Sequence, residues 1–269
     1  MFRILSLVVA GLFAFGAEAH ELWMDSPAFQ ITSDSPLEVD IRIGEAFNGA
    51  RYGFLPREFR RFDVVHNGRI RPVPGRIGDI PAARFAPFGE GLHVLVYRTV
   101  DRMLTYHAWT KFVDFTDHKG FGHLQEAHEA RGLPQTGFKE IYSRYAKTLI
   151  GVGEAEGKDA PIGLETEIVA LANPYTDDLS SGFPVEVLYQ GTPRADAQIE
   201  LFEKTPDGTV EIALYRTDDM GRALLPVKAG HIYQVDAVVA RMPSAELAAR
   251  TGGVWETLWA NLTFAVPED

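Results

Sequence analysis

A histidine stands where a secretory cleavage site would make it the first residue of the mature chain. Arg3, an apolar run over residues 4–15 and the sequence A-E-A at 17–19 follow the order of a signal peptide. The apolar run, about twelve residues, is too short to span a bilayer. We therefore expect residues 1–19 to be removed and a chain beginning at His20 to be exported to the periplasm.

Cleavage at this position would change the chemistry of His20. A free α-amine has a pKa of about 7.7 to 8, so it deprotonates readily and can bind a metal. Together with the ring Nδ1 of the same residue it forms a chelate, and a second histidine would complete a histidine brace suited to Cu(II) or Ni(II). The alternative is that histidine follows the cleavage site by chance.

Candidate partners for His20 lie in the middle of the chain. His107, His118, His123 and His128 fall within 22 residues, and the last three are spaced by five. This spacing differs from the i, i+4 spacing that stacks two rings on one helix face. We expect His20 to be joined in a metal site by one or two of them, in the order of preference His118, His128, His107, His123. The alternative is a solvated helix with scattered histidines.

The remaining histidines fit structural positions. His66 precedes Asn-Gly, a turn signal, and His93 lies in an alternating strand pattern. His231 begins a strand-like run, where we expect it to be exposed. Met24 is either a soft axial ligand or, together with Leu22, the inward face of a first strand.

The composition excludes several classes of function. A formal charge of −11 disfavours nucleic acid and anionic lipid, both of which need clustered Lys and Arg. The chain has no cysteine, so any metal must be held by other ligands. No nucleophile elbow, phosphate-binding loop or HExxH motif is present, and the many carboxylates show no assignable catalytic pair.

The N-terminal half is predicted to be β-rich with a helical insertion. Residues 36–43, 61–69 and 91–99 alternate apolar and polar side chains as strands do. Residues 122–133 contain good helix formers, and 137–153 have an apolar i, i+4, i+8 pattern. We therefore expect a β-rich domain over 20–152 with a helical segment at about 122–150.

The character of the sequence changes after residue 150. Residues 151–163 are rich in glycine and charge and lack periodicity, which is typical of a linker. Seven short strand-like runs separated by turn signals follow, which is typical of an antiparallel β-sandwich. The predicted fold class is thus mainly β, with a C-terminal immunoglobulin- or transthyretin-like sandwich over 164–269.

Five segments together resemble an exported family known as domain of unknown function 4198, whose members are often described as periplasmic components of cobalt or nickel uptake. They are "HELW" at the mature N-terminus, "SRYAK" (143–147), "LANPY" (171–175), "LYQGTPRADAQIELF" (188–202) and "TDDMGRALLPVKAGHIY" (217–233). The resemblance implies a metal-associated periplasmic protein in which His20 is the family's leading histidine. Relatives carry another histidine near the position of Val239, and its absence here gives more weight to the central histidines.

These observations lead to one main functional prediction and two alternatives. We expect a periplasmic protein that binds Cu, Ni or Co through His20 and serves metal uptake or handling, with a membrane transporter as a candidate partner. One alternative is a copper-dependent oxidase with an aromatic substrate surface formed by Trp23 and Trp109. The other is an adhesion or scaffold module without a metal, since a β-sandwich fold by itself carries no function.

Overall fold

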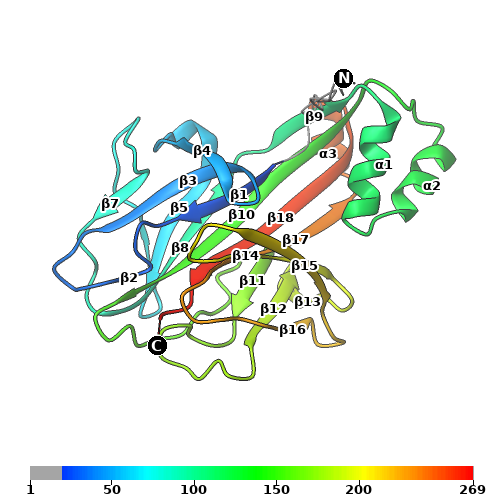
Figure 1. The fold of residues 1–269 in the computed structure, drawn as a ribbon. Coiled ribbons are helices and arrows are strands. Elements are labelled where there is room, and N and C mark those ends of the chain that lie inside the picture. The colour runs from blue at the N-terminus through cyan, green and yellow to red at the C-terminus, as the bar shows by residue number, and fades with distance from the viewer. Residues whose placement is uncertain (1–19, 269) are drawn as a thin grey trace, which may run out of the picture.

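The computed structural model describes residues 20–268, so the predicted signal peptide lies outside the described residues. The chain is mainly β, with three short α-helices (Figure 1). Up to the predicted linker its elements are β1 (Glu21–Asp25), β2 (Gln30–Ile31), β3 (Leu37–Glu45), β4 (Asn48–Tyr52), the 3₁₀-helix η1 (Pro56–Glu58), β5 (Phe59–His66), β6 (Arg69–Pro72), β7 (Ala83–Phe85), β8 (Gly91–Thr99), β9 (Arg102–Tyr106), α1 (Trp109–His118), α2 (His123–Ala130) and β10 (Phe138–Val152).

All seven strand-like runs predicted after the linker form strands. The elements are β11 (Thr166–Ala170), β12 (Phe183–Tyr189), β13 (Thr192–Pro193), β14 (Gln198–Lys204), β15 (Val210–Arg216), β16 (Arg222–Leu225), β17 (Ile232–Arg241), α3 (Ala245–Thr251) and β18 (Gly253–Ala265). Within residues 20–268, no helix has the length and apolar character that a membrane crossing requires.

One large sheet runs through both halves of the chain. Its strand order is β15-β14-β17-β18-β10-β8-β5-β6, and β2 and β9 also pair with β10. The long strands β10 and β18 lie side by side in parallel through the middle of the molecule (Figure 1). The sheet therefore continues across the predicted boundary near residue 150, and the division into two domains stays a prediction.

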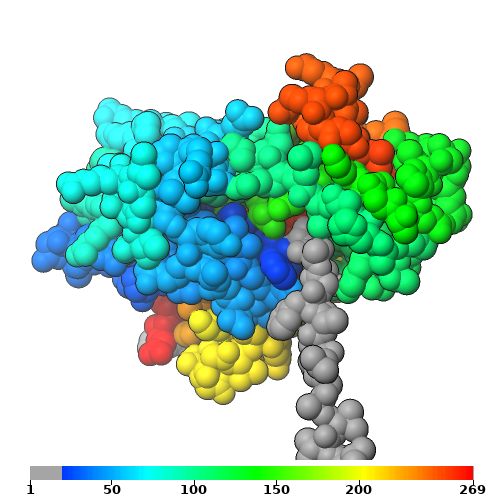
Figure 2. Space-filling view, turned by 90° about the horizontal axis from the view of Figure 1, so that it is seen from above, coloured from blue at the N-terminus to red at the C-terminus, as the bar shows by residue number. Residues whose placement is uncertain are grey.

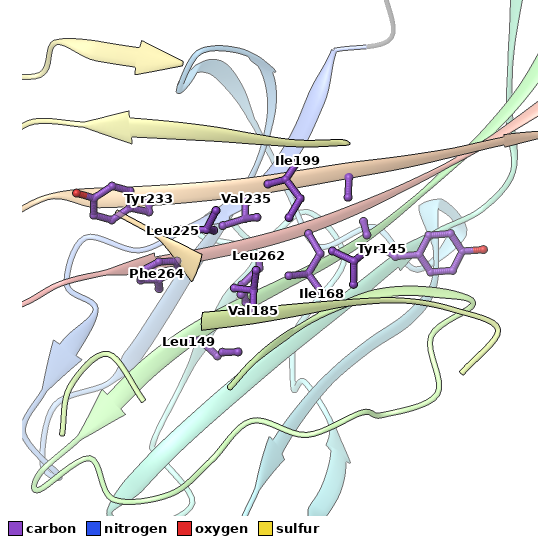
Figure 3. Packing of buried hydrophobic residues seen from close by; sticks show 14 of the residues in the cluster. Tyr145, Leu149, Ile168, Val185, Ile199, Leu225, Tyr233, Val235, Leu262 and Phe264 are labelled. Atoms are coloured by element: carbon purple, nitrogen blue, oxygen red, sulfur yellow. The ribbon is translucent and has the colours of Figure 1, made fainter. Parts of the chain in front are cut away.

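Two smaller sheets cover the large sheet and enclose separate cores. The sheet of β11, β12, β13 and β16 helps to enclose the core drawn in Figure 3. The sheet of β1, β3, β4 and β7 contributes to the other. Strand β10 serves both, because Tyr145 and Leu149 point to the first core whereas Ala146 and Ile150 belong to the second.

The prediction of a helix over residues 137–153 is wrong, because this segment is strand β10. Ile141, Tyr145 and Leu149 are four residues apart, and a spacing of four also keeps side chains on one face of a strand. Nearly all the residues between them are buried as well, including the polar Ser143, Lys147 and Thr148, because β10 is a central strand covered on both faces. The helical prediction is confirmed for α2 (His123–Ala130).

The predicted linker contains no helix or strand over residues 154–165, but it is anchored. Asp159 lies 2.6 Å from Nζ of the buried Lys147, and its carboxylate also accepts the backbone N–H of Ala170. Lys147 lies 3.1 Å from Glu167, which accepts backbone N–H groups from the linker. A polar, glycine-rich sequence is thus held in one conformation by buried charges that local periodicity does not reveal.

Candidate functional site

A pocket of about 450 Å³ lies where the start of the described chain meets helix α1. In the view of Figure 2 the dark blue start of the chain lies in a depression between the blue and cyan strands and the green helical segment. The pocket is lined by His20, Glu21, Glu45, Ala46, Tyr106, Lys111, Asp114, Phe115, His118, Lys119, Glu200, Phe202, Ile212 and Trp259. It therefore brings together His20 and His118, the first two residues of the predicted metal site.

Strand pairing places a carboxylate beside His20. Strand β1 runs antiparallel to β3 with Glu21 opposite Gly44, so the residue before β1 lies next to Glu45. His20 Nδ1 is 3.0 Å from Glu45 Oε1, but the contact lacks hydrogen-bond geometry. Nδ1 is buried and has no hydrogen-bond partner within residues 20–268, and the His20 carbonyl accepts a hydrogen bond from Arg144. A buried ring nitrogen without a partner is a position where a ligand would be favoured.

His118 is the last residue of helix α1. The helix stops there because Gly120 adopts a φ of +71°, which reverses the chain after the C-cap Lys119. His118 Nε2 lies 3.2 Å from Glu200 Oε1. The hydrogen bond and charge of Glu200 raise the pKa of His118.

Beneath the two histidines lies a cluster of buried charges. Lys119 Nζ is 2.8 Å from Glu200 and 3.7 Å from Asp236, which stand opposite each other on β14 and β17. Burial raises the pKa of Asp236 to about 7 and also raises the pKa of Glu21, against the attraction of Lys119. One carboxylate oxygen of Asp236 and one of Glu21 lack hydrogen-bond partners in the described chain. Asp236, which lies behind the Lys119 and Glu200 side chains that line the pocket, is therefore expected to exchange its proton near neutral pH.

His107 and His123 were the two least favoured of the central histidines. Both are exposed and do not line this pocket. His128 is fully buried among aromatic rings. Its Nδ1 accepts the indole N–H of Trp255 at 3.0 Å, and its Nε2 lies 3.0 Å from the Pro134 carbonyl. Both ring nitrogens of His128 are thus used inside the protein.

The histidines assigned to structural positions behave mostly as expected. His93 is buried, with both ring nitrogens hydrogen-bonded, and burial lowers its pKa to about 4. His66 ends β5, precedes the turn and stacks on His93. His231 is not exposed as predicted: its side chain is 14% accessible, because Nδ1 turns inward to Glu203. Met24 is fully buried and belongs to the second core.

The aromatic surface required by the oxidase alternative is not formed by Trp23. Its side chain is completely buried, and the Trp109 ring packs against Phe112, Phe138 and His128. A substrate surface around His20 therefore cannot include Trp23.

The side chains of this pocket can hold a metal ion only if the N-terminal amine of His20 is also a ligand. Among residues 20–268, no three His, Asp or Glu side chains are grouped closely enough to hold an ion. His20 would supply an amine after cleavage and has an Nδ1 that makes no hydrogen bond, while His118, Glu45 and Glu200 line the same pocket. The two carboxylates were missed from the sequence because each is far from its histidine along the chain. An acidic residue inside an otherwise apolar strand, as at Glu200 and Asp236, was the sequence signal that could have indicated a buried carboxylate.

Comparisons with known proteins identify a family but no relative of known activity. Among curated proteins none matches. One solved structure, described as a tetra-tandem repeat in the extending region of a large adhesion protein, shares 10% identity with a TM-score of 0.21. The match covers 91% of this chain and 49% of that one, so this chain spans about half its length, and at this TM-score the likeness carries no argument. The model of the family described as domain of unknown function (DUF4198) matches residues 17–241. The chain therefore belongs to the DUF4198 family.

Proposed function

We propose that this protein binds a divalent transition metal in the periplasm and takes part in metal uptake or handling. The observation that carries the proposal is the shared pocket of His20 and His118, in which His20 Nδ1 is buried without a hydrogen-bond partner. Two histidines distant in sequence, each beside a carboxylate, resemble the carboxylate–histidine pairs that orient metal ligands.

In the proposed site His20 anchors the ion through its α-amine and Nδ1. His118 is the second imidazole ligand, and Glu45 supplies an oxygen ligand or orients the His20 ring. Nitrogen-rich sites favour Cu(II) over Ni(II) and Co(II) in the usual affinity order. The bound metal would then pass to a membrane transporter or be stored.

The proposal predicts that metal binding competes with protons. A protonated imidazole has no lone pair for a metal, and Glu200 raises the pKa of His118. Metal affinity should therefore fall as the pH is lowered through the raised pKa of His118.

The test is a titration of the mature chain with Cu(II), Ni(II) and Co(II) in parallel. A second protein carries one alanine before His20, which converts the amine into an amide and removes the chelate. We expect this extension to weaken binding of the preferred ion by about a hundredfold or more, and His118→Ala to weaken it by about tenfold. His123→Ala, an exposed histidine outside the pocket, is the matched control and should bind normally.

Equal affinity of the mature and extended chains would contradict an N-terminal site. Loss of binding in His123→Ala equal to that in His118→Ala would show nonspecific capture by surface histidines.

A further inference from the structure

A second pocket of about 500 Å³ adjoins the first, and His20 lines both. Its walls come from β1, β3, β4, η1, β8, β9 and β10 and are largely apolar. They are formed by the aliphatic side chains of Leu22, Ile41, Ile43, Leu55 and Leu104 and by the aromatic rings of Tyr52, Tyr97 and Tyr142. Its volume and mixed lining are those of a site for a small organic molecule.

Positively charged side chains outnumber negatively charged ones in the lining of this pocket. Arg57, Arg102 and Arg144 line it together with a single acidic residue, Glu58. Arg57 and Arg102 both pair with Glu58, so one carboxylate is shared between two guanidinium groups. Within a chain of formal charge −11, this excess of arginine is a local exception.

Arg144 is the most unusual of the three. It is 6% exposed, donates to the His20 carbonyl and lies over the Tyr142 ring at 4.7 Å, and no salt bridge to it is found within residues 20–268. Its Nε is buried without a hydrogen-bond partner there. The charges of Glu21 and Asp236 attract this guanidinium, but no carboxylate of residues 20–268 forms an ion pair with it, so an anion entering the pocket would supply a direct partner.

We propose that this second pocket binds an amphipathic organic acid, with the carboxylate near the arginines and the hydrocarbon part against the aliphatic and tyrosine side chains. Arginine recognises carboxylates through paired N–H donors, and the three arginines of this pocket share a single lining carboxylate, Glu58. The apolar walls select acids with a hydrocarbon body over small inorganic anions. The binding does not require a metal, so it is independent of the function proposed above.

The test uses the mature chain freed of metal by passage over a chelating resin, since soluble chelators are themselves carboxylates. Octanoate and 3-phenylpropanoate serve as aliphatic and aromatic probes in calorimetric titrations. Octan-1-ol has the same body as octanoate without the charge, and octylammonium reverses the charge. We expect saturable binding of at least one acid, about tenfold weaker binding of the alcohol and no binding of the cation.

The double variant Arg57→Gln, Arg102→Gln removes two arginines whose side chains are 81% and 47% exposed, so it should leave the fold intact. It should weaken binding of the acid by about tenfold. Arg60→Gln, an exposed arginine on β5 outside the pocket, should have no effect.

Three results would overturn the proposal. They are no saturable binding of either acid, equal binding of octanoate and octan-1-ol, and equal weakening by Arg60→Gln and by the double variant. None of them depends on whether His20 binds a metal.

Discussion

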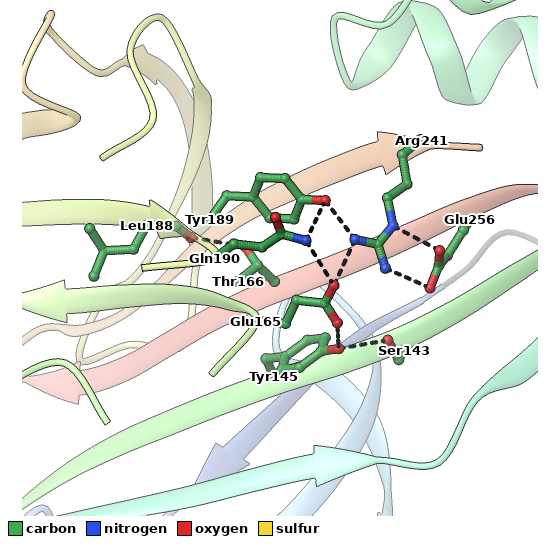
Figure 4. A network of polar contacts seen from close by, with 9 residues as sticks. All are labelled: Ser143, Tyr145, Glu165, Thr166, Leu188, Tyr189, Gln190, Arg241 and Glu256. Atoms are coloured by element: carbon green, nitrogen blue, oxygen red, sulfur yellow. Dashed lines mark hydrogen bonds and ion pairs between the residues drawn. The ribbon is translucent and has the colours of Figure 1, made fainter. Parts of the chain in front are cut away.

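Two clusters of charged residues in this protein differ in how completely their members are paired. The first surrounds Arg241 at the end of β17 (Figure 4). Its guanidinium donates to both oxygens of Glu256, at 2.8 and 3.1 Å, and to Glu165 at 2.6 Å. Tyr145 donates to the other oxygen of Glu165. Although burial opposes it, Arg241 lowers the pKa of Glu165 and so favours its ionised form.

The second cluster lies below His20 and His118 and is incompletely paired. Lys119 is shared between Glu200 and Asp236, and oxygens of Asp236 and Glu21 remain without hydrogen-bond partners in the described chain. Burial raises the pKa of both Asp236 and Glu21, the opposite of the shift at Glu165.

The difference separates structural from functional charge. A cluster whose donors and acceptors are all paired has no capacity left for a ligand, and breaking it leaves an uncompensated charge. A cluster with unpaired atoms beside a pocket can take up protons or a cation. We therefore expect substitutions around Arg241 to change stability, and substitutions beneath the pocket to change titration and binding.

The largest expected effect is on stability, in Arg241→Ala. Removing a fully buried partner costs about 3–5 kcal/mol, and because this guanidinium is partly exposed we expect about 3 kcal/mol. Urea unfolding measures the loss, and the folded variant should bind metal as the parent does. Lys228→Ala removes an exposed cation paired with Glu203; it is the control and should cause a much smaller loss of stability, because solvent screens the pair. An equal loss of unfolding free energy in both variants would contradict the structural role assigned to the Arg241 cluster.

His128→Ala tests whether complete pairing predicts a structural role for a histidine too. It would leave the Trp255 N–H without its acceptor and create a cavity among aromatic rings, at a cost of about 2 kcal/mol. Thermal or urea unfolding measures this cost, and metal titration should give unchanged affinity. A large loss of metal affinity in the folded variant would instead make His128 a ligand.

Asp236→Asn tests the incompletely paired cluster through pH. The raised pKa means that the folded protein keeps this proton up to about pH 7, whereas the unfolded chain loses it near its ordinary pKa of 3.8. This group therefore makes the parent less stable as pH rises from about 4 to 7. The stability of the parent minus that of the variant should fall over this range. A difference that is constant with pH would contradict the assignment.

The smallest expected effect is a change in the pKa of one side chain, His118, in the variant Glu200→Gln. Without this carboxylate the pKa of His118 should fall towards its ordinary value, because the hydrogen bond and charge of Glu200 raise it. Titration of the His118 ring resonances in the metal-free protein measures the change. Glu203→Gln, which removes the partner of His231, should leave His118 unaffected. An unchanged His118 pKa in Glu200→Gln would show that the two groups do not interact in solution.

Local sequence was sufficient for many elements of this fold. Period-two alternation correctly predicted β3, β5 and β8. After the linker, the seven strand-like runs separated by turn signals correctly predicted β11, β12 and β14 to β18. The Asn-Gly signal correctly marked the turn after His66, where Asn67 and Gly68 have φ values of +48° and +70°.

Position along the chain likewise singled out His20, since the predicted cleavage site lies directly before it. His118 was then favoured among the central histidines. The structure brings these two into one pocket. That they hold a metal stays a prediction.

Tertiary structure decided what local periodicity leaves undetermined. A spacing of four residues fits one face of a helix and one face of a strand, so only the pairing of β10 with β18, β8 and β9 made residues 138–152 a strand. The carboxylates beside His20 and His118 come from β3 and β14, and strand register and helix docking bring them there. Sequence determined which side chains were available to do chemistry. Non-local pairing determined which of them meet, because the contacts between distant strands have no signature in the order of residues.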